Sequence, residues 1–357
     1  MRNIRERHVS ALETLVSRMR EQAGWCRRLG SPLYAHLMEQ IAVDLLAGGP
    51  SRDVLAGHED DPLTSALALR LLGAVHRMAL DGRAPAVAAH FPSAGGADRG
   101  DVWPAVRDLF AGHRDVLCTL LERPVQTNEV GRCAALLGGF VTVAAETGLP
   151  LALVEIGASA GLNLRWDRFH YEAAGATWGD STSPVRMACD FTGPYPRRDV
   201  AVRVVARDGC DTNPLDPASD DGALTLQSYV WPDQLERLTL LRAAIEVART
   251  VPARVDATDA GAWIGRHLAA RPSGVATVVY HSIVWQYLTR DTRAAVKDAI
   301  LRAGAAATRE APLAWLRLEP VGREGPFEVR LTSWPGGAER RLAESSPHGR
   351  EVRWYAS

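Results

Sequence analysis

Apolar residues follow two different patterns along the chain. From about residue 9 to residue 147 they recur every three or four positions, as in Leu67, Leu71, Val75 and Met78. This spacing puts them on one face of a helix and predicts a series of amphipathic helices. The segments between these helices carry the Gly, Pro, Ser and Asp residues that end helices and form loops. No strand is expected in this half.

After Gly148 the pattern changes to short β-branched runs that alternate with helical stretches. Such alternation is typical of βαβ units and predicts a mostly parallel sheet. The two clearest helices are WPDQLERLTLLRAAIEVAR, with Pro232 in its first turn, and RDTRAAVKDAILRAGAAA. The expected strands are LALVEIG, VAVRVVARD, residues 253–257, VATVVYHS, PLAWLRLEP, FEVRLTSW and EVRWYA, the last two forming an antiparallel hairpin. We therefore expect an all-helical domain over residues 1–148 and an α/β domain over residues 149–357.

Composition narrows the class of protein. The 357 residues are 46% hydrophobic, enough for a large core and two domains. Lys and Arg total 41 against 42 for Asp and Glu, so no net charge favours nucleic acid or an anionic membrane as a partner. The N-terminus MRNIRERHVSALETLVSRMR is charged and amphipathic, and no apolar run approaches the length of a membrane span. A cytoplasmic protein is expected.

The five cysteines are widely separated and include no C-x-x-C pair. Neither a disulfide framework nor a zinc site is indicated, and a reducing compartment fits this usage. No cluster of His, Cys and carboxylate residues has the spacing of metal ligands, so no metal is expected.

The stretch VEIGASAGLNL after the first expected strand has two interpretations. Residues 157–161 match the G-x-S-x-G nucleophile elbow, which would make Ser159 the nucleophile of a serine hydrolase. Alternatively, Glu155, Gly157 and Gly161 form a buried strand end and a small-residue loop before a helix N-terminus, an arrangement that receives nucleotide-like ligands. A hydrolase elbow follows several strands, whereas only helices are expected before Leu151. The second interpretation is therefore favoured.

The later strands also end in groups that could contact a ligand. Ligands of open α/β sheets bind beyond the carboxyl ends of the strands, near the point where strand order reverses. The polar ends of the next expected strands are Asp208, Asp211 and Asn213, then Asp256 and Asp259, then the run YHSIVWQY.

These residues resemble the class I S-adenosylmethionine-dependent methyltransferases. The resemblance implies a Rossmann-like sheet in which Glu155, Gly157 and Gly161 form the cofactor loop. It also implies that Asp211 holds the ribose hydroxyls and that Asp259 with Ala260 lies beside the adenine. Ser159 departs from the usual E-x-G-x-G-x-G pattern and is expected to be tolerated if its φ stays negative. The remaining expected cofactor contacts are Ala158, Ser159, Asn163, Asn213, His281 and Ser282.

A closer resemblance covers most of the chain. The phrases VEIGASAGLNL, GCDTNPLD, VWPDQLERL, HSIVWQYL, APLAWLRLEP and SPHG resemble the actinobacterial domain-of-unknown-function family 2332. That family implies no activity, so the methyltransferase expectation rests on fold analogy and the loop motifs. Two alternatives stay open: a catalytically silent nucleotide-binding or scaffolding protein, and a serine hydrolase using Ser159.

The acceptor is expected to be a small molecule. In the methyltransferase fold His281 would lie next to the sulfonium, which makes it the candidate catalytic base. Trp285 and, from the polar insertion HYEAAGATWGDSTSPVRMACDFTGPYP, Tyr171 and Asp180 are the candidate substrate contacts. The helical domain is a candidate surface for homodimer formation.

Overall fold

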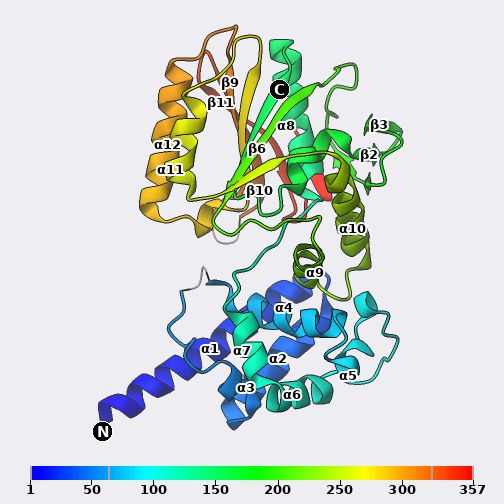
Figure 1. Cartoon of the computed structure of the whole chain (residues 1–357), viewed down its shortest axis with the longest axis vertical. Coiled ribbons are helices and arrows are strands. Elements are labelled where there is room, and N and C mark those ends of the chain that lie inside the picture. The colour runs from blue at the N-terminus through cyan, green and yellow to red at the C-terminus, as the bar shows by residue number, and fades with distance from the viewer. Residues whose placement is uncertain (1, 63–64, 323–324, 356–357) are drawn as a thin grey trace. The chain divides into compact units, whose positions relative to one another are not determined.

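The computed structural model describes residues 2–62, 65–322 and 325–355 (Figure 1). The chain divides into two compact units. One consists of Met1–Thr127 with Ala223–Thr239, and the other of Asn128–Gly222 with Leu240–Ser357. The chain therefore leaves the second unit once and returns to it, so neither unit is one continuous segment.

The first unit is helical, as the apolar spacing predicts. Leu71, Val75 and Met78 are fully buried in its core. Ser31 starts one of its longer helices by accepting a hydrogen bond from Tyr34 N, and a proline follows at the first helical position. The helices before residue 128 are α1 (Arg2–Arg28), α2 (Pro32–Ala47), α3 (Pro50–Val54), α4 (Leu67–Leu80), α5 (Pro85–Ala88), η2 (Pro92–Ala94), α6 (Trp103–Gly112) and α7 (Arg114–Leu121).

A later segment completes this helical unit. It runs from α9 (Asp220–Ser228) into α10 (Leu235–Thr250) and buries Trp231 in the helical core. The carboxylate of Asp233 accepts hydrogen bonds from Ser31 Oγ at 2.6 Å and from Leu33 N at 3.1 Å. The motif VWPDQLERL thus has a structural role. Because α10 begins at Leu235, Pro232 precedes the helix and does not lie in its first turn as expected.

The second unit is built on a mixed sheet. Among the described residues, nine strands have the order β5-β12-β11-β10-β9-β8-β1-β6-β7. The five strands from β7 to β9 are parallel, and β9, β10, β11 and β12 pair antiparallel. The strands are β1 (Leu151–Ile156), β5 (Asp190–Thr192), β6 (Val204–Asp211), β7 (Arg254–Ala257), β8 (Ala276–Ser282), β9 (Leu313–Pro320), β10 (Phe327–Trp334), β11 (Ala338–Ser345) and β12 (Glu351–Trp354). The α/β class, the mostly parallel order and the C-terminal antiparallel strands are confirmed. The expected hairpin of FEVRLTSW with EVRWYA is wrong, because β11 lies between β10 and β12 and pairs with both.

Helices cover both faces of the parallel strands (Figure 1). α11 (Ala260–Leu268) and α12 (Arg290–Ala305) share one core with Trp315 of β9. The next residue, Leu316, points to the opposite face and packs against Gly139 of α8 (Arg132–Thr147), where an added Cβ would lie 2.3 Å from Leu316 Cδ1. α8 therefore belongs to the sheet unit, although its apolar pattern groups it with the preceding helices.

The insertion between β1 and β6 has more regular structure than its turn-rich composition predicts. It begins with the 3-10 helix η3 (Leu162–Arg168) and forms a three-stranded sheet of β2 (His170–Ala173), β3 (Ala176–Gly179) and β4 (Arg186–Ala188). Its last strand, β5, crosses to the far edge of the large sheet and pairs with β12.

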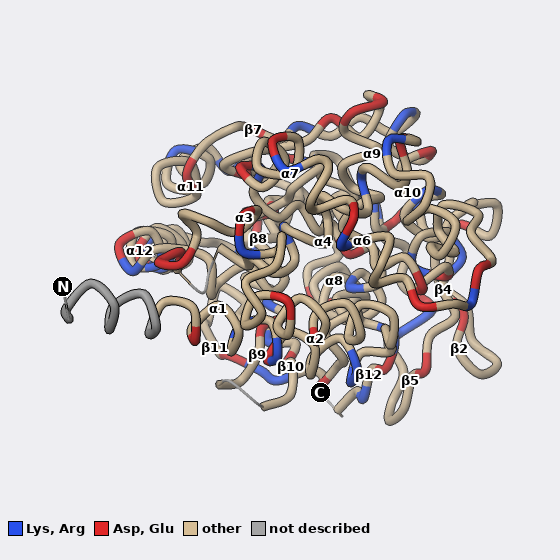
Figure 2. Tube along the Cα trace, turned by 90° about the horizontal axis from the view of Figure 1, so that it is seen from below, with Lys and Arg blue, Asp and Glu red and all other residues tan. Residues whose placement is uncertain are grey.

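Basic and acidic residues are both distributed along the described trace (Figure 2). Within the residues that the structure describes, no helix is both long enough and apolar enough to cross a membrane.

Candidate functional site

The candidate site lies at the carboxyl ends of the parallel strands. In the sheet, β1 lies between β6 and β8. After β1 the chain forms β6 on one side of it, and it later forms β8 on the other side. Strand order therefore reverses at β1, which is where open α/β sheets bind their ligands. Glu155 and the loop of residues 157–161 are at this point.

The loop after β1 is a tight turn. Gly157 and Gly161 have φ of +68° and +67°, a conformation that glycine adopts without steric cost. Ser159 also has a positive φ, +53°, so the condition under which a serine was expected to be tolerated at this position is not met. A non-glycine residue there is strained, and such strain persists only where the surroundings fix it.

The end of β6 fixes this loop. Ser159 N donates to Asp211 Oδ2 at 2.9 Å, and Asn213 N donates to Asp211 Oδ1 at 2.9 Å. Leu215 N donates to the carbonyl of Ser159 at 3.3 Å, while Gly157 N donates to the carbonyl of Cys210 at 2.9 Å. The motifs VEIGASAGLNL and GCDTNPLD therefore contact each other directly, as the expected cofactor site requires. The side chain of Asn213 is exposed and turns to Thr212 Oγ1.

Glu155 is almost completely buried at the end of β1, with 2% of its surface exposed. Its Oε2 accepts a hydrogen bond from the hydroxyl of Tyr280 on β8 at 3.1 Å. Burial raises the pKa of the Glu155 carboxyl to about 8, although the Tyr280 bond acts in the opposite direction. The strand end therefore carries a carboxyl group that is largely neutral near pH 7.

Buried polar groups support the far side of the loop. Arg165 of η3 donates to the carbonyl of Gly161 at 2.6 Å, and desolvation lowers the pKa of its guanidinium to about 10. The Asn128 side chain accepts from Leu162 N at 2.9 Å. Asn163, expected to contact a cofactor, is buried and bonds the carbonyl of Glu129 at 3.3 Å. Its amide thus ties η3 to the segment that precedes α8.

His281 on β8 is 1% exposed and is held by a residue of the next strand. Its Nδ1 lies 2.7 Å from Oε1 of Glu319 at the end of β9. The ring of Trp285, in the 3-10 helix η4 (Trp285–Tyr287), stacks on the imidazole with centroids 5.1 Å apart. The candidate base and the candidate substrate contact are thus in direct contact.

The segment between them approaches the loop after β1. A Cβ added to Gly157 would lie 2.3 Å from Val284 Cγ2, so only glycine fits beneath this side chain. The carbonyl of Ser282 accepts from Arg132 Nη1 at 3.0 Å, and Arg132 Nε donates to the carbonyl of Pro347 at 3.1 Å. The motif SPHG therefore lies beside the N-terminus of α8, at the same end of the parallel strands.

Asp259 has a structural role in the fold. It caps α11 by accepting from Gly261 N at 2.8 Å and Ala262 N at 3.3 Å, and it accepts from Thr292 Oγ1 of α12 at 2.9 Å. This carboxylate joins two helices. Ala260 follows it as the buried first residue of α11.

The other two candidate substrate contacts lie in the small three-stranded sheet. Tyr171 is fully buried on β2, and its hydroxyl donates to the carbonyl of Trp166 at 2.8 Å. Asp180 is exposed after β3 and accepts from the amide and hydroxyl of Thr182. Hydrogen bonding by Thr182 lowers the pKa of this carboxyl. Both residues have bonding partners that stabilise the local fold.

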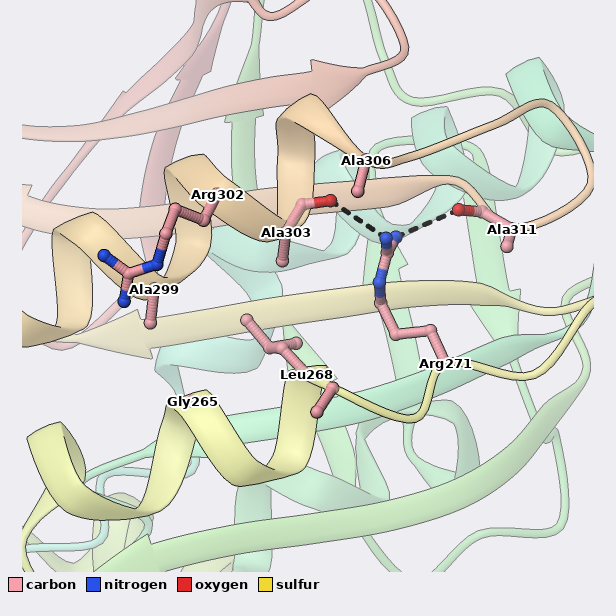
Figure 3. Close-up of a pocket in the computed structure, with 9 residues that line it drawn as sticks. Gly265, Leu268, Arg271, Ala299, Arg302, Ala303, Ala306 and Ala311 are labelled. Atoms are coloured by element: carbon pink, nitrogen blue, oxygen red, sulfur yellow. Dashed lines mark hydrogen bonds between the residues drawn. The ribbon is translucent and has the colours of Figure 1, made fainter.

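A groove of about 420 Å³ lies between α11 and α12 (Figure 3). It is near the residues that precede β8 and β9, at the opposite end of the strands from Gly157. Arg271, on its wall, donates to the carbonyls of Ala303 at 2.9 Å and Ala311 at 3.0 Å. Its guanidinium thus connects the last turn of α12 to the segment that precedes β9.

All five cysteines are free, and burial raises the pKa of Cys210, beside the loop, to about 12. A thiol with such a pKa is not a nucleophile near neutral pH. Across the described residues, no three His, Cys, Asp or Glu side chains gather as metal ligands would.

Sequence reasoning missed Glu319, and it gave no individual role to Tyr280 and Val284 of the run YHSIVWQY. Glu319 had a usable signal, because it ends a predicted strand next to the one that carries His281. Tyr280 and Val284 lie within HSIVWQY and its flank, but their contacts depend on strand pairing.

The chain belongs to a family of uncharacterized proteins conserved in bacteria, the domain-of-unknown-function family 2332, whose model matches residues 16–354. No curated protein and no solved structure matches it.

Proposed function

We propose that the protein is an S-adenosylmethionine-dependent methyltransferase that acts on a small molecule. One observation carries the proposal: a glycine loop follows β1 at the point of strand reversal, and a carboxylate at the end of β6 bonds that loop. The parallel order β7-β6-β1-β8-β9 is that of the first five strands of a Rossmann-like sheet. We include in the proposal that this sheet is the Rossmann-like sheet of a class I methyltransferase.

The residues of the loop fit such a cofactor. Each carboxylate oxygen of Asp211 accepts one backbone hydrogen bond, which leaves each a further lone pair for a ribose hydroxyl. Gly157 and Gly161 give the loop its two positive φ values and let it pack beneath Val284 and Val255, so they shape the turn that a ligand would meet. When bound, S-adenosylmethionine supplies an electrophilic methyl group, and the chain has to orient an acceptor towards it.

His281 and the segment after β7 have different roles in this proposal. His281 is the candidate base, since Nδ1 is bonded to Glu319 and the other ring nitrogen has no hydrogen-bond partner within the described part of the chain. Asp259 Oδ1 accepts two hydrogen bonds from α11 and Oδ2 accepts one from α12, so an adenine beside this segment would contact Ala260, the backbone or the remaining lone pair of Oδ2.

The serine hydrolase has less support. All elements described before β1 are helices, so no earlier strand supplies the oxyanion loop of such a fold. The free Nε2 of His281 does not bond Ser159, so the two do not form a nucleophile and base pair. The catalytically silent protein is retained as an outcome of the binding experiments.

The proposal is tested by the affinity for S-adenosylhomocysteine of the wild type and of Asp211→Ala. Loss of a hydrogen bond to a charged group should weaken binding by roughly 1.5–3 kcal/mol, or about 10- to 150-fold. The matched control is Asp208→Ala, on the same strand, whose carboxylate lies 3.7 Å from His267 Nε2. Equal affinities of all three proteins would show that Asp211 does not hold the ligand.

A further inference from the structure

Two buried polar atoms at the ends of β8 and β9 have no hydrogen-bond partner among the described residues. They are Nε2 of His281 and Oε2 of Glu319. Buried polar groups are nearly always paired, so an unpaired one calls for a ligand group or a bound water. The two side chains bond each other through Nδ1 and Oε1 at 2.7 Å. The second nitrogen of the imidazole and the second oxygen of the carboxyl group are therefore available to a ligand. Other buried polar atoms in the described part of the sheet unit are unpaired as well, but this pair brings two of them together on bonded side chains.

Glu319 determines which nitrogen of His281 carries the proton. Its Oε1 also lies 3.1 Å from Val284 N and 3.3 Å from Trp285 N, both of which can only donate. An oxygen that accepts two backbone hydrogen bonds is acting as an acceptor and has no proton to donate, so the third partner, Nδ1, must be a donor as well. In the neutral ring Nε2 then has a bare lone pair.

The turn between β8 and η4 is held under strain. Ile283 has a φ of +52°, which is an outlier for a β-branched residue. Its amide donates to the carbonyl of Leu318 at 2.9 Å, and the next two amides donate to Glu319. Such strain persists only where surrounding bonds fix it and is concentrated at functional sites. The side chain of Glu319 thus fixes both the backbone of the turn and the orientation of the His281 ring.

Two indole rings surround the imidazole. Trp285 stacks on it with an interplanar angle of 14°, and the centroid of Trp315 lies 6.0 Å away. Aromatic walls with one or two polar groups are typical of pockets for flat ligands. A lone-pair acceptor in such surroundings matches a ligand that has a hydroxyl on a flat, unsaturated body.

We infer that His281 and Glu319 form a positioned proton acceptor for the hydroxyl of an aromatic or enolic ligand. Nε2 of His281 takes the proton, and Glu319 is the positioning residue. The O–H bond breaks, its electron pair stays on the oxygen, the proton forms the N–H bond at Nε2, and the carboxylate offsets the charge of the imidazolium. That this ligand is the methyl acceptor rests on the proposed function; the arrangement of the pair does not.

The test is nuclear magnetic resonance of the full chain labelled with ¹⁵N-histidine, with phenol as the probe and toluene as its counterpart without a hydroxyl. His281→Asn assigns the signals by removing them. In the wild type, Nδ1 should be protonated and Nε2 not, and phenol should shift the Nε2 resonance while toluene at equal concentration does not. A protonated Nε2 with a bare Nδ1, or equal responses to the two probes, would overturn the inference.

Two variants separate positioning from folding. Glu319→Ala should give a mixture of ring tautomers and lose the phenol response, whereas Glu319→Gln, which retains an oxygen acceptor, should keep Nδ1 protonated. The control is Glu172→Gln, because Glu172 lies 3.1 Å from Nε2 of His170, another buried histidine. It should leave the His281 signals unchanged. Unchanged His281 signals in Glu319→Ala would also overturn the inference. None of these measurements requires S-adenosylmethionine, so they can succeed where the proposed function fails.

Discussion

At the scale of single residues, Glu155 makes the unfolding free energy of the protein depend on pH. Its pKa is raised from 4.5 to about 8, mainly by burial. The folded protein thus holds this proton over a pH range in which the unfolded chain has lost it, so the stabilising contribution is full below about pH 4.5 and disappears as pH rises through 8. Glu155→Gln, which is neutral at all pH values, should flatten the fall of the unfolding free energy between these limits, by up to a few kcal/mol.

Urea unfolding at a series of pH values measures this slope. Glu146→Gln is the control, because Glu146 is a partly exposed carboxylate of α8 paired with Arg340. It should keep the slope of the wild type. If Glu155→Gln kept that slope as well, the carboxyl group would be ionised in the folded protein, contrary to the effect of its burial.

The sequence identified the residues of the loop better than their partners. Glu155, Gly157 and Asp211 could be predicted because a strand end, a glycine and a following strand end are local patterns. Tyr280 and Glu319 could not be paired with Glu155 and His281, because that requires knowing which strands are neighbours. Asp259 caps α11, and a capping aspartate and a ligand-binding aspartate look alike after a strand, so the sequence alone does not separate the two roles.

At the scale of elements, the loop after β1 and the turn after β8 are packed against each other. Gly157→Ala brings a Cβ to 2.3 Å from Val284 Cγ2 and puts alanine at a positive φ. We expect a loss of roughly 1–2 kcal/mol for the backbone and a further 1–3 kcal/mol for the overlap. A Val284→Ala background removes the overlap with Cγ2 and leaves the Cβ of residue 284 at 3.0 Å, so the backbone part and a smaller steric part should remain.

The control separates the two effects. Gly148→Ala places alanine at a φ of +64° with no atom within 4 Å of the new Cβ, so it should cost only the backbone part. The unfolding free energies of the four proteins of the Gly157 and Val284 cycle give the coupling. Additive losses would mean that the two segments do not touch in solution.

Several elements could be predicted from the sequence and others could not. The parallel strands and α12 have clear periodicity. β11 was missed because its sequence AERRLAES has three charged residues in a row, and it is a strand because β10 and β12 pair with it on both sides. The small sheet of β2, β3 and β4 was missed because its strands have only three or four residues and lie among turns. Strands this short depend on pairing more than on propensity.

At the scale of the whole molecule, the helical unit depends on a segment that is distant in sequence. Asp233 accepts two hydrogen bonds at the start of α2, one of them from the fully buried Ser31. Asp233→Ala should destabilise this unit by roughly 2–3 kcal/mol, because it removes a charged acceptor and leaves a buried hydroxyl with one partner fewer. Hydrogen exchange in peptides from α2 and α4 measures the effect.

Asp115→Ala serves as the control for this prediction. Asp115 is 96% exposed on α7 and pairs with Arg114, and exposed ion pairs contribute little to stability. Exchange in α2 and α4 should stay as in the wild type. The same protection in Asp233→Ala would mean that the other contacts of the segment, such as the burial of Trp231 and the bond from Gln234 Nε2 to the carbonyl of Leu29, are enough to hold it. The expected homodimer stays a prediction, which the mass of the full chain in solution would test.

The central claim is that the loop after β1 binds S-adenosylmethionine, and calorimetric titration of the full wild-type chain tests it most directly. S-adenosylmethionine and S-adenosylhomocysteine are compared with ATP and NAD at the same concentrations. The first two should bind with a dissociation constant in the micromolar range, about −8 kcal/mol, while ATP and NAD should bind far more weakly. Absence of binding by both sulfur ligands at near-millimolar concentration, or preferential binding of ATP or NAD, would contradict the account.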